Sequence, residues 1–234
     1  MTHPSHTVVI GGTSGIGLAT AALLVNQEKA VTIVGRDQAK LDAAIDQLGQ
    51  FTKGVIADAA DRAALDVLFA KLAPIDHLVI AASGGAGAGP FESLHLDDLR
   101  HGFEAKFWVQ LNVAQAALPS VAPNGSITFV TAASSRFANP GTAGLAAING
   151  AIERMVATLA RELAPLRVNA VSPGVTDTPW WADKPAALFD QESRKAPLGR
   201  AGRPEEVADA VLFLIGNQFI TGVVLDVDGG LHLT

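Results

Sequence analysis

Short runs of apolar, mostly β-branched residues alternate along the chain with longer segments whose apolar residues recur at the spacing of an α-helix. The short runs occupy residues 7–10, 30–34, 54–57, 77–82, 126–130, 167–171 and 223–227. Strands that alternate with helices in this way are typical of βαβ units, which build a parallel sheet with helices on both faces. The pattern therefore predicts an α/β fold with a doubly wound parallel sheet. No repeat or linker interrupts it, so we expect residues 1–234 to form a single domain.

Two helices have the clearest signals. In residues 143–163 one side of the predicted helix is apolar, with Ile148, Ile152, Met155, Val156, Leu159 and Leu163. The polar side is expected to carry Glu153, Arg154, Arg161 and Glu162. A later helix is predicted to begin at Pro204, because proline followed by Glu205 and Glu206 suits a first helical turn.

Residues 175–197 form the one long stretch that lacks a clear period, and we expect them to be irregular. They include three prolines and the apolar side chains Trp180, Trp181, Leu188 and Phe189. A segment of this length inside a compact domain is more often a lid or binding loop than a boundary. We therefore expect a lid whose aromatic side chains cover an apolar pocket. Burial of the same aromatic residues at a subunit interface is the alternative.

Composition narrows the possible partners. Hydrophobic residues make up 49% of the chain and charged residues 17%, which suits strands buried on both faces. The net charge is −6 and basic runs are lacking, so we expect neither a nucleic acid nor a membrane as partner. The chain has no cysteine, which excludes disulfides and thiol chemistry. No secretory signal is visible at its start, and we expect a cytoplasmic protein.

The first predicted strand leads directly into a glycine-rich turn that precedes a helix. The turn consists of Gly11, Gly12, Thr13, Ser14, Gly15, Ile16 and Gly17. Glycines at such a place let backbone N–H groups approach a pyrophosphate at the positive end of the helix. A glycine turn can also be purely structural. Its position after an N-terminal strand, with βαβ units following, favours a dinucleotide site.

The spacing of Gly11, Gly15 and Gly17 resembles that of the short-chain dehydrogenase/reductase family. Ile10 stands where the family has a threonine. The resemblance extends through almost the whole chain, and residues 221–230 are similar to the family's C-terminal strand and oligomer contact. It implies a Rossmann-like fold, an oxidoreductase acting on a small-molecule substrate, and a homo-dimer or homo-tetramer.

The residues after the second strand indicate which dinucleotide is bound. Relatives that prefer NAD carry an acidic residue at the end of this strand, and here that place is Gly35, followed by Arg36. A guanidinium can pair with a 2′-phosphate, whereas a carboxylate would repel it. We therefore expect NADP(H). Two observations leave this open: Asp37 is only one residue away, and Arg36 can also be a solvated residue at the start of a helix.

Further cofactor residues follow from the resemblance. Asp58 stands where the family contacts the adenine amino group, although it can equally cap the helix that begins near Asp61. The small residues Ala82 and Gly84 let the backbone pass close to the cofactor. The stretch that holds the nicotinamide carboxamide is matched by Pro173, Gly174, Val175 and Thr178.

The family's catalytic residues are missing. In the family, a tyrosine transfers the proton, a lysine lowers its pKa, a serine orients the carbonyl and an asparagine holds a water relay. This chain contains no tyrosine. Alignment through residues 160–163 and 167–174 gives Leu145 for the tyrosine and Asn149 for the lysine. Counting back from Leu145 and forward from residues 125–127 gives Ala132 for the serine, and matching residues 115–118 gives Lys106 for the asparagine. Leucine cannot transfer a proton, so the usual mechanism is excluded.

The remaining candidates for catalysis are Lys106 and Ser134. A lysine in an apolar pocket can act as a general acid or stabilise a developing alkoxide. Alternatively, Lys106 pairs with a cofactor phosphate or with Glu104, or points to solvent. Ser134 and Ser135 can also serve a turn or helix cap. Asn149 can bond a ribose hydroxyl or only pack within its helix.

His95 and His101 precede Lys106, and we expect surface positions and no metal for them. Two main functions follow. The first is an atypical NADP(H)-dependent oxidoreductase acting on an apolar carbonyl or alcohol, with a non-standard proton source. The second is a non-catalytic NADP(H)-binding sensor or regulatory protein. A non-redox reaction in the same pocket is a third.

Overall fold

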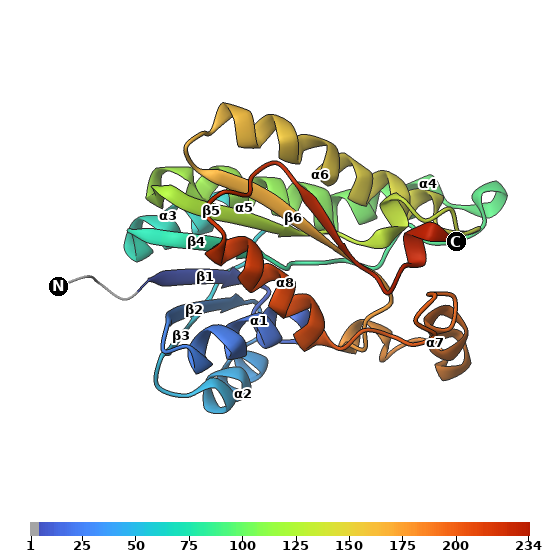
Figure 1. The fold of residues 1–234 in the computed structure, drawn as a ribbon, viewed down its shortest axis with the longest axis horizontal. Helices are drawn as coiled ribbons and strands as arrows, with labels where there is room; N and C mark the ends of the chain where they lie inside the picture. Colours follow the sequence, from blue (N-terminus) through green and yellow to red (C-terminus); the bar gives the residue numbers. More distant parts are fainter. Residues whose placement is uncertain (1–4) are drawn as a thin grey trace.

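A computed structural model describes residues 5–234 and confirms the predicted fold class (Figure 1). Its seven strands form one sheet in the order β3-β2-β1-β4-β5-β6-β7, and every neighbouring pair is parallel. The strands are β1 (His6–Ile10), β2 (Ala30–Gly35), β3 (Thr52–Ile56), β4 (Ile75–Ile80), β5 (Val121–Val130), β6 (Arg167–Pro173) and β7 (Val224–Val227). The strand order reverses at β1, which pairs with both β2 and β4. Such a reversal opens a crevice at the carboxyl ends of the two strands.

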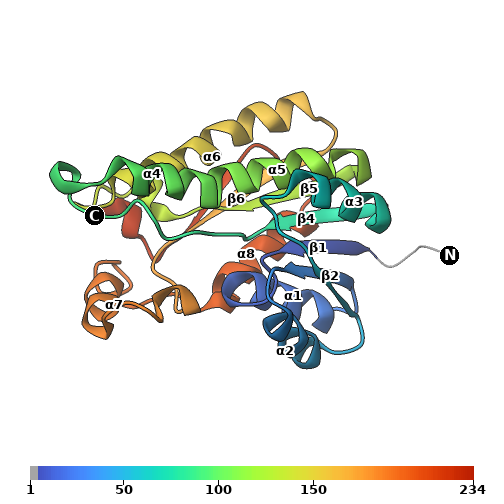
Figure 2. The same cartoon turned by 180° about the vertical axis from the view of Figure 1, so that it is seen from behind.

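Helices cover both faces of this sheet. The α-helices are α1 (Gly15–Asn26), α2 (Gln38–Leu48), α3 (Arg62–Leu72), α4 (Leu96–Gly102), α5 (Val109–Ala117), α6 (Ala143–Glu162), α7 (Ala186–Ser193) and α8 (Pro204–Gly216). A π-helical turn, η2 (Phe103–Trp108), joins α4 to α5. Five 3₁₀ turns complete the described chain: η1 (Phe91–Ser93), η3 (Leu118–Ser120), η4 (Ala133–Ser135), η5 (Pro179–Trp181) and η6 (Leu231–Leu233). Helices α1, α2 and α8 lie on one face, and α3, α4, α5 and α6 lie on the other (Figures 1 and 2).

The core consists of two apolar layers, one on each face of the sheet. In β1, Val8 and Ile10 pack toward α3, α5 and α6, whereas Val9 packs toward α1, α2 and α8. These three side chains are at most 2% exposed. Because both faces are covered, the central strands are apolar at successive positions rather than at alternate ones. This is the reason that the strands could be located as short apolar runs.

Residues 175–197 are irregular only in part, which corrects the expectation from the sequence. They contain η5 and α7. Two of the prolines that suggested a loop stand at helix starts: Pro179 is the first residue of η5, and Pro185 is the N-cap of α7. Proline is tolerated there because the first N–H groups of a helix have no intrahelical partner.

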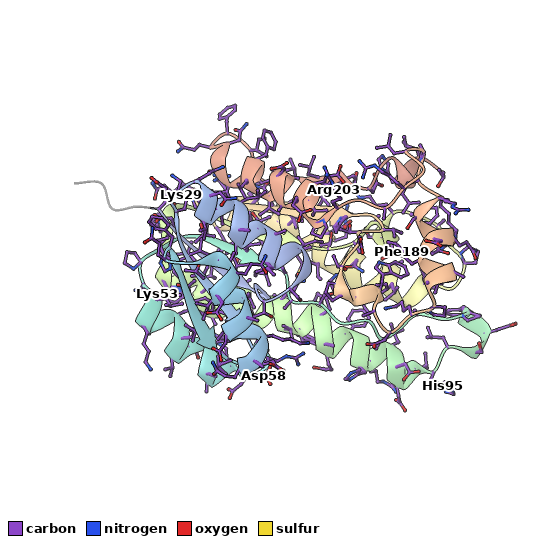
Figure 3. The ribbon with its side chains drawn as sticks, turned by 90° about the horizontal axis from the view of Figure 1, so that it is seen from below. Lys29, Lys53, Asp58, His95, Phe189 and Arg203 are labelled. Carbon is purple, nitrogen blue, oxygen red and sulfur yellow. The ribbon has the colours of Figure 1, made fainter. Side chains whose placement is uncertain are left out.

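The carboxyl ends of the strands meet at one edge of the sheet, and α7 lies beyond this edge (Figures 1 and 2). In Figure 3, Phe189 on α7 lies at the opposite end of the molecule from Lys29 and Lys53. The latter two mark the amino ends of β2 and β3. Within residues 5–234 no helix is long and apolar enough to span a membrane. The turns that follow the strands at the carboxyl edge position the site.

Candidate active site

A cleft of about 970 Å³ opens at the carboxyl edge of the sheet. Its walls are the turns after β1, β2, β3, β4, β5 and β6, together with the start of residues 175–197. Every residue proposed above for cofactor or catalysis lines it: Gly11, Thr13, Ser14, Gly15, Ile16, Gly17, Arg36, Asp58, Ala82, Gly84, Lys106, Ser134, Asn149, Pro173, Gly174, Val175 and Thr178. The fold thus gathers into one cavity residues that are as far apart in sequence as Gly11 and Thr178.

The glycine-rich turn is pressed against the end of β4. Gly11 has a φ of 79°, and a Cβ on it would lie 2.9 Å from the backbone nitrogen of Ala82. A Cβ on Gly17 would collide with the carbonyl oxygen of Gly11. The Ser14 side chain does not cap α1, so backbone N–H groups at the start of α1 remain available to a ligand. This cradle has the form and polarity that a pyrophosphate requires.

Beside the glycine turn, the cleft reaches the start of α2. A Cβ on Gly35 would lie 2.6 Å from Cγ2 of Thr13, so any side chain at this position would require Thr13 to move. The Asp37 carboxylate caps α2 and accepts a hydrogen bond from the Lys40 N–H (2.9 Å). Because the Asp37 carboxylate already accepts this hydrogen bond, the positive charges of Arg36 and Lys40 are the ones available to a ligand in this part of the cleft.

Asp58 lies on the same side of the cleft and is not a helix cap. The N-cap of α3 is Asp61, whose carboxylate accepts a hydrogen bond from Ala64 N–H at 3.1 Å. Asp58 accepts one from Ala60 N–H at 3.0 Å within the turn after β3. The capping alternative for Asp58 is therefore wrong. Its second carboxylate oxygen, Oδ2, accepts no hydrogen bond from the described residues.

Lys106 lies in the π-helical turn η2 and is buried, with 6% of its surface exposed. Its Nζ donates a hydrogen bond to the carbonyl oxygen of Thr131, at the end of β5 (3.1 Å). Burial lowers the pKa of Lys106 to about 8, while the charge of Glu153 opposes this shift. The alternatives of a solvent-exposed lysine and of an ion pair with Glu104 do not agree with this placement; residues 5–234 contain no such pair.

Asn149 and Ser134 also line the cleft and are in contact with each other. Asn149 is 3% exposed, and its Nδ2 donates hydrogen bonds to Oγ of Ser134 (3.2 Å) and to the carbonyl oxygen of Leu145 (2.9 Å). Its Oδ1 is buried and accepts no hydrogen bond from any described residue. Ser135 instead bonds to Ala132 within η4 and to Glu153, in keeping with a structural role in the turn.

The aromatic residues after β6 form the outer wall. Trp180 and Trp181 line the cleft, and Phe189 packs edge-on behind Trp181 with ring centroids 5.3 Å apart. The ammonium of Lys184 lies over the Trp180 ring, 3.2 Å from its centroid. At the base of the wall, Thr178 contacts the glycine turn, since a Cβ on Gly15 would lie 3.3 Å from it. Residues 178–189 thus extend from the glycine turn to a group of aromatic side chains at the cleft.

Comparison with known proteins places the chain in a family. A family model described as Enoyl-(Acyl carrier protein) reductase matches residues 11–232. The 3-oxoacyl-[acyl-carrier-protein] reductase FabG of Thermotoga maritima is 32% identical over 238 residues, which cover 96% of each chain. A short-chain dehydrogenase/reductase of Malbranchea aurantiaca, malC, is 30% identical over 250 residues, covering 97% of this chain and 94% of the relative. The chain is a short-chain dehydrogenase/reductase.

Solved structures agree with this assignment. A small-chain dehydrogenase in complex with NADPH has a TM-score of 0.82 at 32% identity, covering 99% of this chain and 100% of the other. The MalC Reductase/Diels-Alderase of Malbranchea aurantiaca has a TM-score of 0.88 at 28% identity, covering 99% and 97%. This short-chain dehydrogenase/reductase therefore belongs to an oxidoreductase family whose members bind nicotinamide cofactors. No group of side chains suited to a metal ion occurs among its residues 5–234.

Sequence reasoning missed two buried polar residues that contact residues of the cleft. Glu153 was assigned to the polar side of its helix but is 9% exposed, and it accepts a hydrogen bond from the hydroxyl of Thr131, which lines the cleft. Gln110 is fully buried and donates through Nε2 to the carbonyl oxygens of Ala82 (2.9 Å) and Val130 (3.1 Å), tying α5 to two strand ends. The one available signal was the position of Glu153 one helical turn after Asn149.

We expect Gly17→Ala to damage the cofactor cradle of this short-chain dehydrogenase/reductase. The added methyl group collides with backbone, so the free energy of unfolding should fall by about 1–3 kcal/mol. The rise in Tm on adding NADPH should also disappear. Gly150→Ala on α6 is the matched control, because a Cβ there meets nothing within 4 Å and helix propensity improves. If Gly17→Ala and Gly150→Ala had the same Tm and the same rise in Tm with NADPH, the glycine turn would not be the cofactor site.

We expect Lys106→Met to stabilise the protein without cofactor. A pKa displaced from 10.5 to about 8 corresponds to ~3 kcal/mol against the buried ammonium. The variant also loses the hydrogen bond to Thr131, which lowers the free energy of unfolding by ~1 kcal/mol. The net increase in the free energy of unfolding is therefore about 2 kcal/mol at pH 7. Because the unfolded lysine binds more protons between pH 8 and 10.5, the wild type gains stability with rising pH there. Over this range the wild type should gain ~3 kcal/mol, which exceeds the initial difference, so urea unfolding from pH 7 to 10.5 should show the two stabilities approaching each other and then crossing. A constant difference would be evidence against a buried charge.

Proposed function

We propose that this protein is an NADP(H)-dependent oxidoreductase that acts on an apolar carbonyl or alcohol substrate and uses Lys106 as its proton source. The proposal is carried by one observation. The cleft has Leu145 where the family has its tyrosine, and the buried ammonium of Lys106 lies in the same cleft with a pKa of about 8. An acid with a pKa near neutrality is suited to proton transfer at physiological pH.

The residues present fit a nicotinamide dinucleotide. The glycine turn would offer backbone N–H groups to the pyrophosphate, Asp58 would face the adenine, and residues 173–178 would face the nicotinamide; all of them line the cleft. Arg36, with Lys40 beside it, supplies positive charge for a 2′-phosphate, and Gly35 offers no carboxylate to repel it. A bound cofactor would supply the hydride.

Lysine and asparagine have exchanged places relative to the family. By the alignment above, Lys106 occupies the family's asparagine position and Asn149 its lysine position, and both line this cleft. The unpartnered Oδ1 of Asn149 is suited to accept a hydrogen bond from a ribose hydroxyl. The ammonium would thus act from η2 instead of from α6.

In the direction of reduction, an N–H of Lys106 would be donated to the substrate oxygen as the carbonyl carbon gains a hydride. That N–H bond breaks, an O–H bond forms, and neutral lysine regains its proton from solvent. Oxidation would run the same step in reverse. The Ser134 hydroxyl accepts from Asn149, which leaves its own hydrogen free to orient the substrate oxygen.

Residues 175–197 would form a lid over an apolar substrate, because Trp180 and Trp181 line the same cleft as Leu145.

We further propose a single domain over residues 1–234 that assembles as a homo-dimer or homo-tetramer in the cytoplasm. Since the Thermotoga maritima relative is a 3-oxoacyl reductase, 3-oxoacyl thioesters belong in the first substrate panel with cyclic ketones and secondary alcohols.

A non-catalytic NADP(H)-binding sensor is the second candidate. It is favoured by the replacement of all four catalytic positions of the family, which leaves the cofactor cradle intact. Two measurements, the Tm with NADPH and the NADPH absorbance with substrates, distinguish the sensor from the enzyme. A sensor would show a rise in Tm with NADPH by mass action but no change in NADPH absorbance with any member of the panel.

We expect Lys106→Met to lower kcat/KM by about 10²-fold or more, the usual contribution of a general acid. The Kd for NADPH should change less than threefold, because the proposed role of Lys106 concerns the substrate oxygen. Lys53→Met is the control, since Lys53 is exposed at the amino end of β3, far from the lid (Figure 3). Undiminished turnover in the Lys106 variant would remove the proposed proton source.

We expect Arg36→Ala to weaken NADPH binding by about 10- to 100-fold, in line with the loss of a charged hydrogen bond worth ~1.5–3 kcal/mol. NADH binding should change less than threefold, because NADH lacks the 2′-phosphate. Fluorescence titration of both cofactors would measure this, with the exposed Arg154→Ala as control. An equal loss for the two cofactors would contradict the assignment of Arg36 to the phosphate.

A further inference from the structure

Glu153 is a buried carboxylate that the proposed reaction does not yet use. It lies on α6, and its Oε1 accepts hydrogen bonds from the hydroxyls of Thr131 and Ser135, both at 2.7 Å. Its Oε2 is 3.4 Å from Nε of Arg136. A buried carboxylate normally requires such partners, since an unpaired one is costly. What the sequence presented as a surface residue is therefore held in a defined position.

Thr131 joins this carboxylate to Lys106. Its carbonyl oxygen accepts the hydrogen bond from Nζ of Lys106, while its hydroxyl donates to Glu153. Its own N–H is fixed by a 2.9 Å hydrogen bond to the carbonyl oxygen of Val171. The ammonium and the carboxylate thus share one residue at the rigid end of β5.

We infer that Glu153 is a positioning residue for Lys106, which through Thr131 holds the ammonium at the floor of the cleft and keeps it charged. This inference rests on the proposed function only for its consequence in turnover. The pairing of the two groups is a property of the protein alone and can be measured without a substrate.

The charges around the pair determine the direction of the effect. Arg136 partly neutralises Glu153 and also pairs with Asp226 of β7, its NH1 lying 2.8 Å from that carboxylate. The other ionisable groups of the surrounding wall are His101 of α4, Glu104 of η2 and Glu192 of α7, the last paired with Lys195 at 2.7 Å. Among all of these, Glu153 is the one whose charge raises the pKa of Lys106 against burial.

Opposite shifts are therefore expected from the two members of the Glu153–Arg136 pair. Glu153→Gln keeps an oxygen for Thr131 and Ser135 but removes the negative charge, so the pKa of Lys106 should fall by about one pH unit. Arg136→Met leaves Glu153 and Asp226 uncompensated, so the pKa of Lys106 should rise. A general loosening of the fold would not produce shifts of opposite sign.

The experiment is a ¹³C NMR titration of protein labelled at Cε of its seven lysines. The Lys106 signal is assigned by its absence in Lys106→Met. Wild type, Glu153→Gln and Arg136→Met are compared with Glu162→Gln, which removes the same charge from an exposed position of α6. The expected result is a downward shift for Glu153→Gln, an upward shift for Arg136→Met and none for Glu162→Gln.

An unchanged Lys106 titration in Glu153→Gln, or shifts of the same sign in the two variants, would overturn the inference. The pH dependence of reduction then tests the consequence. Turnover requires the protonated lysine, so in Glu153→Gln its loss with rising pH should begin at lower pH. If the NMR titrations shift as expected and the pH profile does not follow, Glu153 still positions Lys106, but Lys106 is not the proton source.

Discussion

The parallel sheet buries both of its faces, and this constraint decides where chemistry can occur in the molecule. Side chains of β1 such as Val8 and Val9 point into two separate apolar layers, so neither face can hold a polar site without loss of packing. A polar binding site is therefore expected at the ends of strands rather than on a face of the sheet. The reversal of strand order at β1 opens the carboxyl edge, and the cleft lies there.

Within that cleft, the backbone and the side chains have different tasks. The cofactor cradle is mainly backbone, and it depends on what is absent: Gly11 and Gly17 lie so close to neighbouring backbone that no Cβ fits. At the other part of the cleft, the distinctive groups are side chains: Lys106 is buried there, and Glu153 is buried behind it. Burial of an ammonium is costly, so its retention is better explained by function than by packing.

Family membership and the chemistry of the site rest on different observations in this protein. Residues 11–232 match the family model, and the glycine turn and the strand ends line one cleft. Under the proposed function, Leu145 takes the place of the family's tyrosine, and Lys106 and Asn149 take the places of its asparagine and lysine. Because Lys106 and Asn149 line the same cleft, an ammonium and an amide would both be available there on an unaltered scaffold.

The sequence by itself was sufficient for the fold, because strands buried on both faces are apolar runs and the turn glycines mark the first βα connection. The residues that the sequence singled out for cofactor binding and catalysis, from Gly11 to Thr178, all line one cleft. Its expectations for single side chains were less accurate: Glu153 was placed on the surface, Asp58 was left as a possible cap, and residues 175–197 were expected to be irregular. The positions of these side chains depend on packing between segments that are distant in sequence. The periodicity of apolar residues along one helix carries no information about that packing. Only the tertiary structure decided that Thr131 brings Lys106 and Glu153 together, because β5, α6 and η2 meet only when the sheet has formed.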